Sequence, residues 1–362
     1  MKRALLALLG LAVGLLLAEG LARTLRPPTG ADLVFPVTPA GTPRGLYQAH
    51  PVLGSAPTPG FEGVVRLPGR QIPVHINQAG LRGPEPAMDR PRWLAVGDSF
   101  TLALQVAEEQ SFPALLGDAM GVQVFNGGIE ASGTTVALDR YRLVDDSVGV
   151  EAVLLLFFTG NDLLDNQQSS QQGGQHHGHG HGQPGPDGPD GPPPTPMGQR
   201  LAQRSYLAAY ATVASRRLAL ARSDGFERTQ LRAQLLPFSA QGIAELTRML
   251  PHTRDALQAL RDEAAIRGDR LLVAVAPPLF VVDQRRAAPT LALAGLDQPT
   301  LDEPQQAVLR QLSDLGIPAC DLTPALRDAQ AAGQAPYLLL DGHWSGAGHR
   351  VAAQAIEDCL RP

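Results

Sequence analysis

The sequence predicts an α/β fold, in which one doubly wound parallel sheet of five strands is covered by helices on both faces. Short apolar segments alternate with longer segments of helical periodicity over residues 91–360, which is the order that crossover connections between parallel strands require. Residues 152–158 are a continuous apolar run, typical of a strand that is buried on both faces. Glycine or polar residues follow several strands, where open sheets of this class form their sites.

The elements follow one another without an internal repeat. The predicted strands cover residues 92–96, 122–126, 152–158, 270–276 and 317–322. The predicted helices run from Thr101 with a break near Ser111, then over 135–146, 199–222, 253–267 and 303–315, and finally to Leu360. Pro113 suits the first turn of a helix capped by Ser111, and Ser345 is the expected N-cap of the last helix.

The first 26 residues differ from the rest of the chain. Lys2 and Arg3 precede 15 uncharged residues, 4–18, and the small residues of Gly20-Leu21-Ala22 follow. This pattern predicts either a cleaved secretory signal peptide or an N-terminal membrane anchor, and both place the main domain outside the cytoplasm, in the periplasm or beyond. Export permits a disulfide between Cys320 and Cys359, with two free buried thiols as the alternative.

The remaining chain divides into two predicted sections. Residues 27–90 are expected to hold a Pro- and Gly-rich tether over 27–50 and then a small β-hairpin formed by 63–67 and 72–77. Residues 91–362 form the main domain, in which 279–301 is expected to be a loop or partial lid.

An insertion at 165–199 interrupts the main domain. It is rich in Gln, Gly, His and Pro and almost free of apolar side chains, so we expect it to be disordered. Its histidine tract could bind Zn²⁺, Ni²⁺ or Cu²⁺ loosely; the histidines are His176, His177, His179 and His181. No metal or cofactor is expected in the catalytic site. A net charge of −5 with scattered arginines argues against a nucleic-acid partner.

Ser99 is the candidate nucleophile, because Gly97-Asp98-Ser99 follows a predicted strand at its turn into a helix. A nucleophilic serine needs a base, a group that orients the base, and donors for the oxyanion. Of nine histidines, His343 lies in a loop two residues after Asp341, whose carboxylate can hold one ring nitrogen. His349, in the first turn of the last helix, is expected to pack or cap.

These residues resemble the SGNH (GDSL-type) hydrolases, including exported, membrane-linked bacterial members. The resemblance covers residues 90–360 and rests on Gly97-Asp98-Ser99, the Gly-containing loop after 122–126, Gly160-Asn161-Asp162, and the Asp341–His343 pair. It implies a flavodoxin-like three-layer fold and a serine ester hydrolase. Residues 76–83 are also similar to a segment that precedes the nucleophile in many membrane-linked members.

The resemblance implies a catalytic triad of Ser99, Asp341 and His343. It also implies an oxyanion hole formed by the N–H groups of Ser99 and residue 131 and by the side chain of Asn161. Two departures stand out. A single residue separates Asp341 from His343, as in related polysaccharide O-acetyltransferases. The glycine that the family has in the loop after strand 122–126 falls here on Ala131, with Gly133 as the alternative register.

Three functions follow as hypotheses. The first is hydrolysis of an ester through an acyl-enzyme, with a small acyl group such as acetyl, carried by a small molecule or a glycan. The second is O-acetyl transfer to a polysaccharide by the same triad. The third is a non-catalytic envelope protein that binds carbohydrate or metal through the histidine tract.

Overall fold

The central sheet has five parallel strands in the order β6-β5-β7-β8-β9. The computed structural model describes residues 2–25, 42–67, 69–87, 89–171, 197–202, 204–222 and 225–361. The strands are β5 (Arg92–Gly97), β6 (Gln123–Asn126), β7 (Ala152–Phe158), β8 (Arg270–Ala276) and β9 (Ala319–Asp321). The chain order reverses beside β5, which makes the carboxyl ends of the strands there the expected place for a site. The predicted parallel α/β sheet is confirmed.

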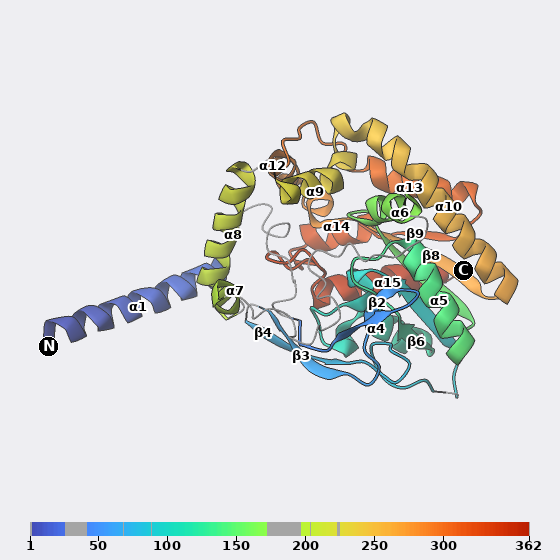
Figure 1. The fold of residues 1–362 in the computed structure, drawn as a ribbon, viewed down its shortest axis with the longest axis horizontal. Coiled ribbons are helices and arrows are strands. Elements are labelled where there is room, and N and C mark those ends of the chain that lie inside the picture. Colours follow the sequence, from blue (N-terminus) through green and yellow to red (C-terminus); the bar gives the residue numbers. More distant parts are fainter. Residues whose placement is uncertain are drawn as a thin grey trace.

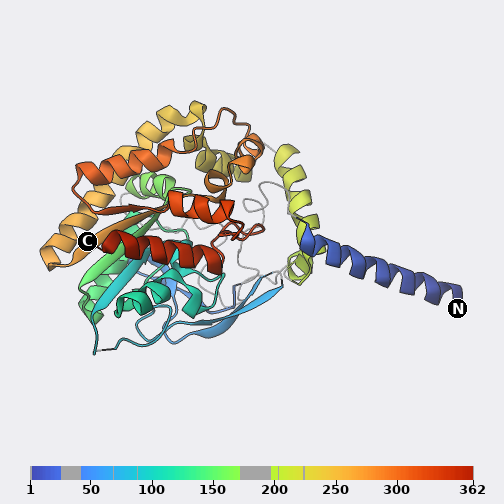
Figure 2. The same cartoon turned by 180° about the vertical axis from the view of Figure 1, so that it is seen from behind.

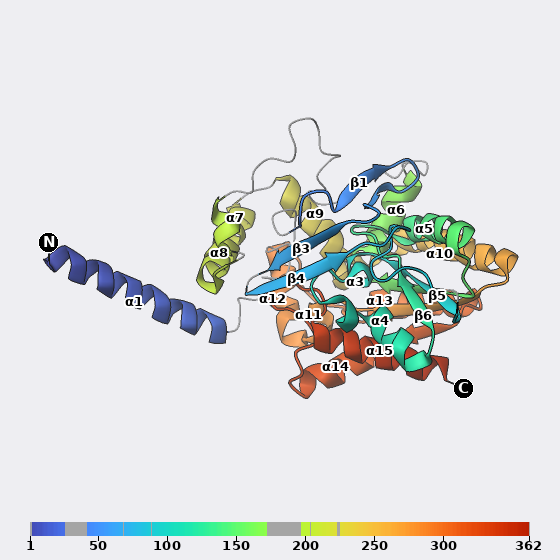
Figure 3. The same ribbon diagram turned by 90° about the horizontal axis from the view of Figure 1, so that it is seen from below.

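Two layers of helices cover the sheet, on opposite faces (Figures 1 and 3). One layer contains α5 (Thr134–Val148), α6 (Asp162–Gln171), α10 (Ile243–Arg267) and α13 (Glu303–Asp314). The other contains α4 (Phe112–Met120), α14 (Thr323–Ala331) and α15 (Gly346–Leu360). Cys320 of β9 is disulfide-bonded to Cys359 of α15, with the two Cα atoms 6.0 Å apart.

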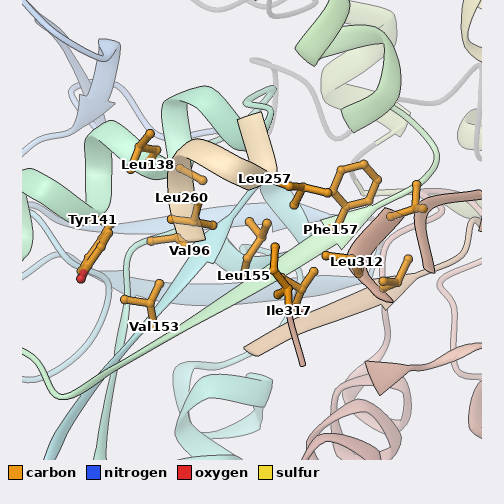
Figure 4. Packing of buried hydrophobic residues seen from close by; sticks show 14 of the residues in the cluster. Val96, Leu138, Tyr141, Val153, Leu155, Phe157, Leu257, Leu260, Leu312 and Ile317 are labelled. Atoms are coloured by element: carbon orange, nitrogen blue, oxygen red, sulfur yellow. The ribbon is translucent and has the colours of Figure 1, made fainter. Parts of the chain in front are cut away.

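Strand β7 shows why the sheet needs both layers. Val153, Leu155 and Phe157 face the layer with α5 and α10, where they pack near Leu257 and Leu260 (Figure 4). The alternate residues of β7 face the layer with α4 and α15. Successive side chains of a strand point to opposite faces, so an unbroken apolar run is buried on both.

Two antiparallel hairpins precede the sheet. The pair β3 (Glu62–Leu67) and β4 (Arg70–His75) is the predicted hairpin. The pair β1 (Tyr47–His50) and β2 (Gly54–Pro57) was not predicted, and its first strand falls within the expected tether. This hairpin is ordered because Leu53 packs against Ile129 and Val136 of the main domain. Helix α1 (Lys2–Thr24) precedes both hairpins, and residues 27–41 of the tether lie outside the described residues.

The insertion is shorter than the sequence composition predicts. Residues 165–171 belong to α6 and residues 197–199 to α7 (Met197–Ala202), so the expectation of disorder is wrong at both ends. Helix α6 is held by buried Leu163 and Leu164 and by Asn166, whose Oδ1 accepts a hydrogen bond from Thr134 N at 2.8 Å. The histidine tract falls within 172–196, outside the described residues.

Further helices form a cap beside the main layers. They are α8 (Tyr206–Arg222), α9 (Phe226–Leu235), α11 (Leu279–Val282) and α12 (Ala287–Leu293). The last two replace part of the loop expected at 279–301, because Phe280, Val281 and Leu291 are buried in one cluster with residues of α8 and α9. Short 3₁₀ turns lie at Glu108–Gln110, Leu236–Phe238, Ala240–Gly242 and Gln284–Arg286.

Candidate active site

Ser99 lies in a sharp turn between β5 and α3 (Ser99–Leu102), a single helical turn where a longer helix was expected. Gly97 has a φ of +145°, and a Cβ there would lie 2.7 Å from the carbonyl oxygen of Leu156, so the turn requires glycine. Asp98 caps α3, since its Oδ1 accepts a hydrogen bond from Phe100 N at 2.9 Å. Ala103 then ends the helix with a φ of +59°.

The structure brings Ser99, His343 and Asp341 together in one hydrogen-bonded chain. His343 Nε2 lies 2.8 Å from Ser99 Oγ, and His343 Nδ1 lies 2.6 Å from Asp341 Oδ1. Asp341 Oδ1 also accepts the backbone N–H of His343 at 3.1 Å. A carboxylate on Nδ1 holds the proton on that nitrogen, which leaves Nε2 as the acceptor for the Ser99 hydroxyl.

An aromatic cluster positions the His343 ring. The ring of Phe100, the residue after Ser99, lies 4.8 Å from the His343 ring and 5.2 Å from the Trp344 ring, measured between centroids. Phe158, at the end of β7, stacks on Phe100 at 4.1 Å. The serine turn and the histidine loop therefore share one packed core.

Arg82 holds the loop that follows α3. Its side chain is buried, and it donates to the carbonyl oxygens of Leu102, Ala103 and Val106. Burial lowers the pKa of the guanidinium to about 10, so it remains charged near neutrality. The segment 76–83 thus supports the nucleophile turn through a charged hydrogen-bond donor.

The loop after β6 lies beside the serine turn. Ile129 N and Ser132 Oγ both donate to Gly97 O, at 3.0 and 3.3 Å. Ala131 has a φ of +52°, whereas Gly133 has a φ of −92° and is the N-cap of α5. A left-handed conformation is one that glycine adopts without strain, and the choice between Ala131 and Gly133 for the family glycine stays a prediction. Within the described residues, the N–H groups of Ser99 and Ala131 have no recorded acceptor, and their oxyanion role stays a prediction.

Asn161 follows β7, and its amide is held by a carboxylate. Asn161 Nδ2 donates to Asp165 Oδ2 at 2.6 Å, and a hydrogen bond from the same side chain acts on Asp98. Burial raises the pKa of Asp165 to about 6 and that of Asp98 to about 7. An amide nitrogen carries two hydrogens, and Asp165 and Asp98 are both partners of this side chain, so its role toward an oxyanion stays a prediction.

Several acidic groups act electrostatically on the His343 ring. Burial by itself would lower the pKa of His343, but the charge and hydrogen bond of Asp341, with Asp98 and Glu130, raise it above its ordinary value. Burial raises the pKa of Glu130, against a hydrogen bond from Tyr47. The imidazolium that forms during proton transfer is therefore stabilised.

The sequence analysis did not identify Asp165 or Glu130. The spacing of four residues between Asn161 and Asp165 in one helical segment was the available signal, but Asp165 had been placed in the disordered insertion. His349 is not the base: it is buried, and its Nδ1 accepts from Phe112 N at 3.2 Å. In the part of the chain that the structure describes, no group of His, Cys, Asp and Glu side chains is arranged to hold a metal ion.

Comparison with known families gives a match over the carboxyl-terminal part of the chain. Residues 231–362 match the model of the SGNH hydrolase-like domain of the acetyltransferase AlgX. This part contains Asp341 and His343 but neither Ser99 nor Asn161. Comparison with curated proteins finds no match.

Several solved structures are similar to this one. They include a G-D-S-L family protein from Desulfitobacterium hafniense, with 13% identity, 74% of this chain and 99% of that chain covered and a TM-score of 0.41. An acetylxylan esterase from Geobacillus stearothermophilus has 13% identity, 77% and 98% coverage and a TM-score of 0.39. The esterase EstA from a Pseudoalteromonas species has 11% identity, 75% and 96% coverage and a TM-score of 0.38.

The match over residues 231–362 makes the carboxyl-terminal part of this chain similar to the SGNH hydrolase-like domain, and the five-stranded parallel sheet agrees with that likeness.

Proposed function

We propose that this protein is an exported serine esterase that removes a small acyl group, such as acetyl, through an acyl-enzyme. The observation that carries the proposal is the chain from Ser99 Oγ to His343 Nε2 and from His343 Nδ1 to Asp341, at 2.8 and 2.6 Å. These are hydrogen-bonding distances for a nucleophile, its base and the group that orients the base.

The reaction follows from these contacts. Ser99 Oγ attacks the ester carbonyl carbon while His343 Nε2 takes the hydroxyl proton. The negative charge that develops on the carbonyl oxygen is stabilised by the N–H groups of Ser99 and Ala131 and by the Asn161 amide. His343 then gives the proton to the departing alcohol, and water attacks the acyl-enzyme in the reverse sequence.

A cavity of about 720 Å³ has polar walls that would suit a polar substrate such as a glycan ester, although Ser99, Asn161 and His343 do not line it. Its walls include Gln105 from the chain after α3 and Ser345, two residues after His343. Three further glutamines line it, namely Gln71, Gln110 and Gln334. Amides and hydroxyls of this kind hydrogen-bond sugar hydroxyls, and the volume is typical of a ligand site.

Transfer of acetyl to a polysaccharide is the second candidate. It is favoured by the family match, whose description names an acetyltransferase, and by the single residue between Asp341 and His343. The acyl-enzyme would be the same in both reactions, and a sugar hydroxyl would replace water in the second step.

The test uses a fluorophosphonate probe and p-nitrophenyl acetate. We expect wild-type protein to be labelled and active, while Ser99→Ala and His343→Ala lose labelling and at least ~10³-fold of the rate. Ser215→Ala, which changes an exposed serine on α8, is the matched control and should behave as wild type. Equal rates for Ser99→Ala and wild type would refute the assignment.

A second experiment separates hydrolysis from transfer. The protein is acetylated on Ser99 with p-nitrophenyl acetate, and the label is followed with and without an added oligosaccharide. Recovery of acetate alone supports the esterase, whereas acetylated sugar supports the transferase.

A further inference from the structure

The end of α1 is bonded to the start of α8, more than 180 residues later in the chain. Glu19 Oε1 accepts the N–H of Tyr206 at 3.0 Å. Glu19 Oε2 accepts the hydroxyl of Ser205 at 2.7 Å and the N–H of Leu207 at 3.0 Å. Figures 1 and 2 show this end of α1 meeting α8, seen from opposite sides.

These contacts complete the N-terminus of α8. The first N–H groups of a helix have no acceptor within the helix. Glu19 supplies acceptors for Tyr206 and Leu207, while Ser205 Oγ accepts from Ala208 N at 3.1 Å. A carboxylate at this position also interacts favourably with the positive end of the helix dipole. Helix α8 is therefore capped by a residue of α1.

Three further contacts fasten the same end of α1. The Arg23 guanidinium bonds to Glu19 at 3.0 Å and lies 5.6 Å from the centre of the Tyr206 ring. Tyr210 donates its hydroxyl to the carbonyl oxygen of Leu25 at 2.6 Å. Ala22 is only 5% exposed. Each of these contacts lies in the last turns of α1 or directly after it.

The remainder of α1 is exposed and apolar. Its leucines, from Leu5 to Leu17, are all more than half exposed, and the 15 residues 4–18 carry no charge. A helix of 23 residues is ~35 Å long, enough to cross a hydrocarbon layer of ~30 Å. The charges of Lys2 and Arg3 favour the cytoplasmic side for the beginning of the helix.

Helix α8 is part of the body that carries the candidate active site. Ala209 and Val213 are fully buried, in a cluster with Phe280 of α11 and Leu340, the residue before Asp341. The end of α1, being joined to α8, is thereby joined to the body that holds the histidine loop. The exposed apolar part of α1 and its part packed on protein thus meet at Glu19.

We propose that the mature protein keeps α1 as a membrane anchor and that Glu19 clamps it to α8, so that the main domain is held at the outer surface of a lipid bilayer. Cleavage after the small residues Gly20-Leu21-Ala22 would remove Glu19 and leave two N–H groups of α8 without their acceptor. The bonds from Tyr206 and Leu207 to Glu19 therefore favour an anchor that is kept over a signal that is removed.

The first measurement is the intact mass of the full chain, exported from a bacterial host with a C-terminal tag and purified from the membrane fraction in detergent. We expect a mass that includes α1, and a protein that stays in the membrane pellet after alkaline carbonate washing. A mature protein that begins at Arg23 or later overturns the proposal.

The second measurement is amide hydrogen exchange in the peptide that covers residues 204–210. Glu19→Ala should exchange Tyr206 and Leu207 about fivefold faster than wild type, the scale of a lost helix cap. Glu19→Gln keeps an acceptor oxygen and should lie between them. Leu17→Ala, at a site 71% exposed on the same helix, is the control and should leave exchange unchanged. Equal exchange in wild type and both Glu19 variants overturns the clamp, whatever the esterase assay shows.

Discussion

Asp341→Asn isolates the charge of the predicted triad from its geometry. Asp341 Oδ1 accepts two hydrogen bonds from His343, one from its backbone N–H and one from Nδ1. An asparagine would place its oxygen there, so His343 keeps the same tautomer. Its NH₂ group would take the place of Oδ2, which is buried and has no hydrogen-bond partner within the described residues.

The expected loss of rate in Asp341→Asn follows from the lost charge. A carboxylate about 4 Å from the imidazolium, at an effective dielectric of ~20, stabilises it by ~4 kcal/mol. The kcat/KM should therefore fall by ~10³-fold. The pKa of His343 should also fall, because burial lowers it and Asp341 is the main group that raises it. The active form has neutral His343, so the acid limb of the pH–rate profile should move to lower pH.

The assay is kcat/KM for p-nitrophenyl acetate between pH 5 and 9. Wild type should have its acid limb above pH 6.5, and Asp341→Asn should have it at lower pH. Asp328→Asn, at an exposed carboxylate of α14, is the control. A folded Asp341→Asn protein with the wild-type rate and profile would show that this carboxylate does not act on the base.

Three further predictions concern the surroundings of the site and the disulfide. Asp165→Ala should lower kcat by up to ~10² with little change in KM, because the Asn161 amide loses this acceptor; unchanged kinetics would contradict this. Asp98→Asn should raise the melting temperature above pH 7 and not below pH 4, measured by calorimetry. Burial raises the pKa of the Asp98 carboxyl from 3.8 to about 7 in the folded protein, so the wild-type protein loses stability as the pH rises from about 4 to about 7. Melting temperatures that depend on pH in the same way in wild type and variant would refute this. Replacing Cys320 and Cys359 by serine should lower the free energy of unfolding by up to ~4 kcal/mol for a separation of 39 residues, measured in urea, and a reductant should destabilise wild type but not the variant.

Much of the fold could be predicted because it depends on local patterns. The apolar runs of β5, β7 and β8 identify strands, since an uninterrupted run of seven apolar residues such as 152–158 is typical of a strand buried on both faces. The predicted helix from Thr101 was wrong because Ala103 takes a left-handed conformation, which no residue pattern there signals. The β1–β2 hairpin and α11–α12 were missed because a few buried side chains order segments of loop-like composition.

The candidate site also contains local contacts, which the sequence suggests, and contacts between distant segments, not all of which it suggests. Asp341 and His343 are two residues apart, so their pairing is a local matter that the sequence suggests. Ser99 lies 244 residues from His343, and its place was inferred from the turn that follows its strand. The partner of Asn161 could not be predicted, because the composition of the insertion hides the buried turn that contains Asp165.

The sequence by itself determined the alternation of strands and helices, the order of Ser99, Asn161 and Asp341–His343 along the sheet, and the apolar character of α1. These features follow from residue periodicity and from the rule that parallel strands end at one edge. Only the tertiary structure decided which acceptor each buried donor meets: Asp165 for the Asn161 amide and Glu19 for the first N–H groups of α8. Such pairings depend on the packing of distant segments, because a buried polar group must bond to whatever partner the fold brings within reach.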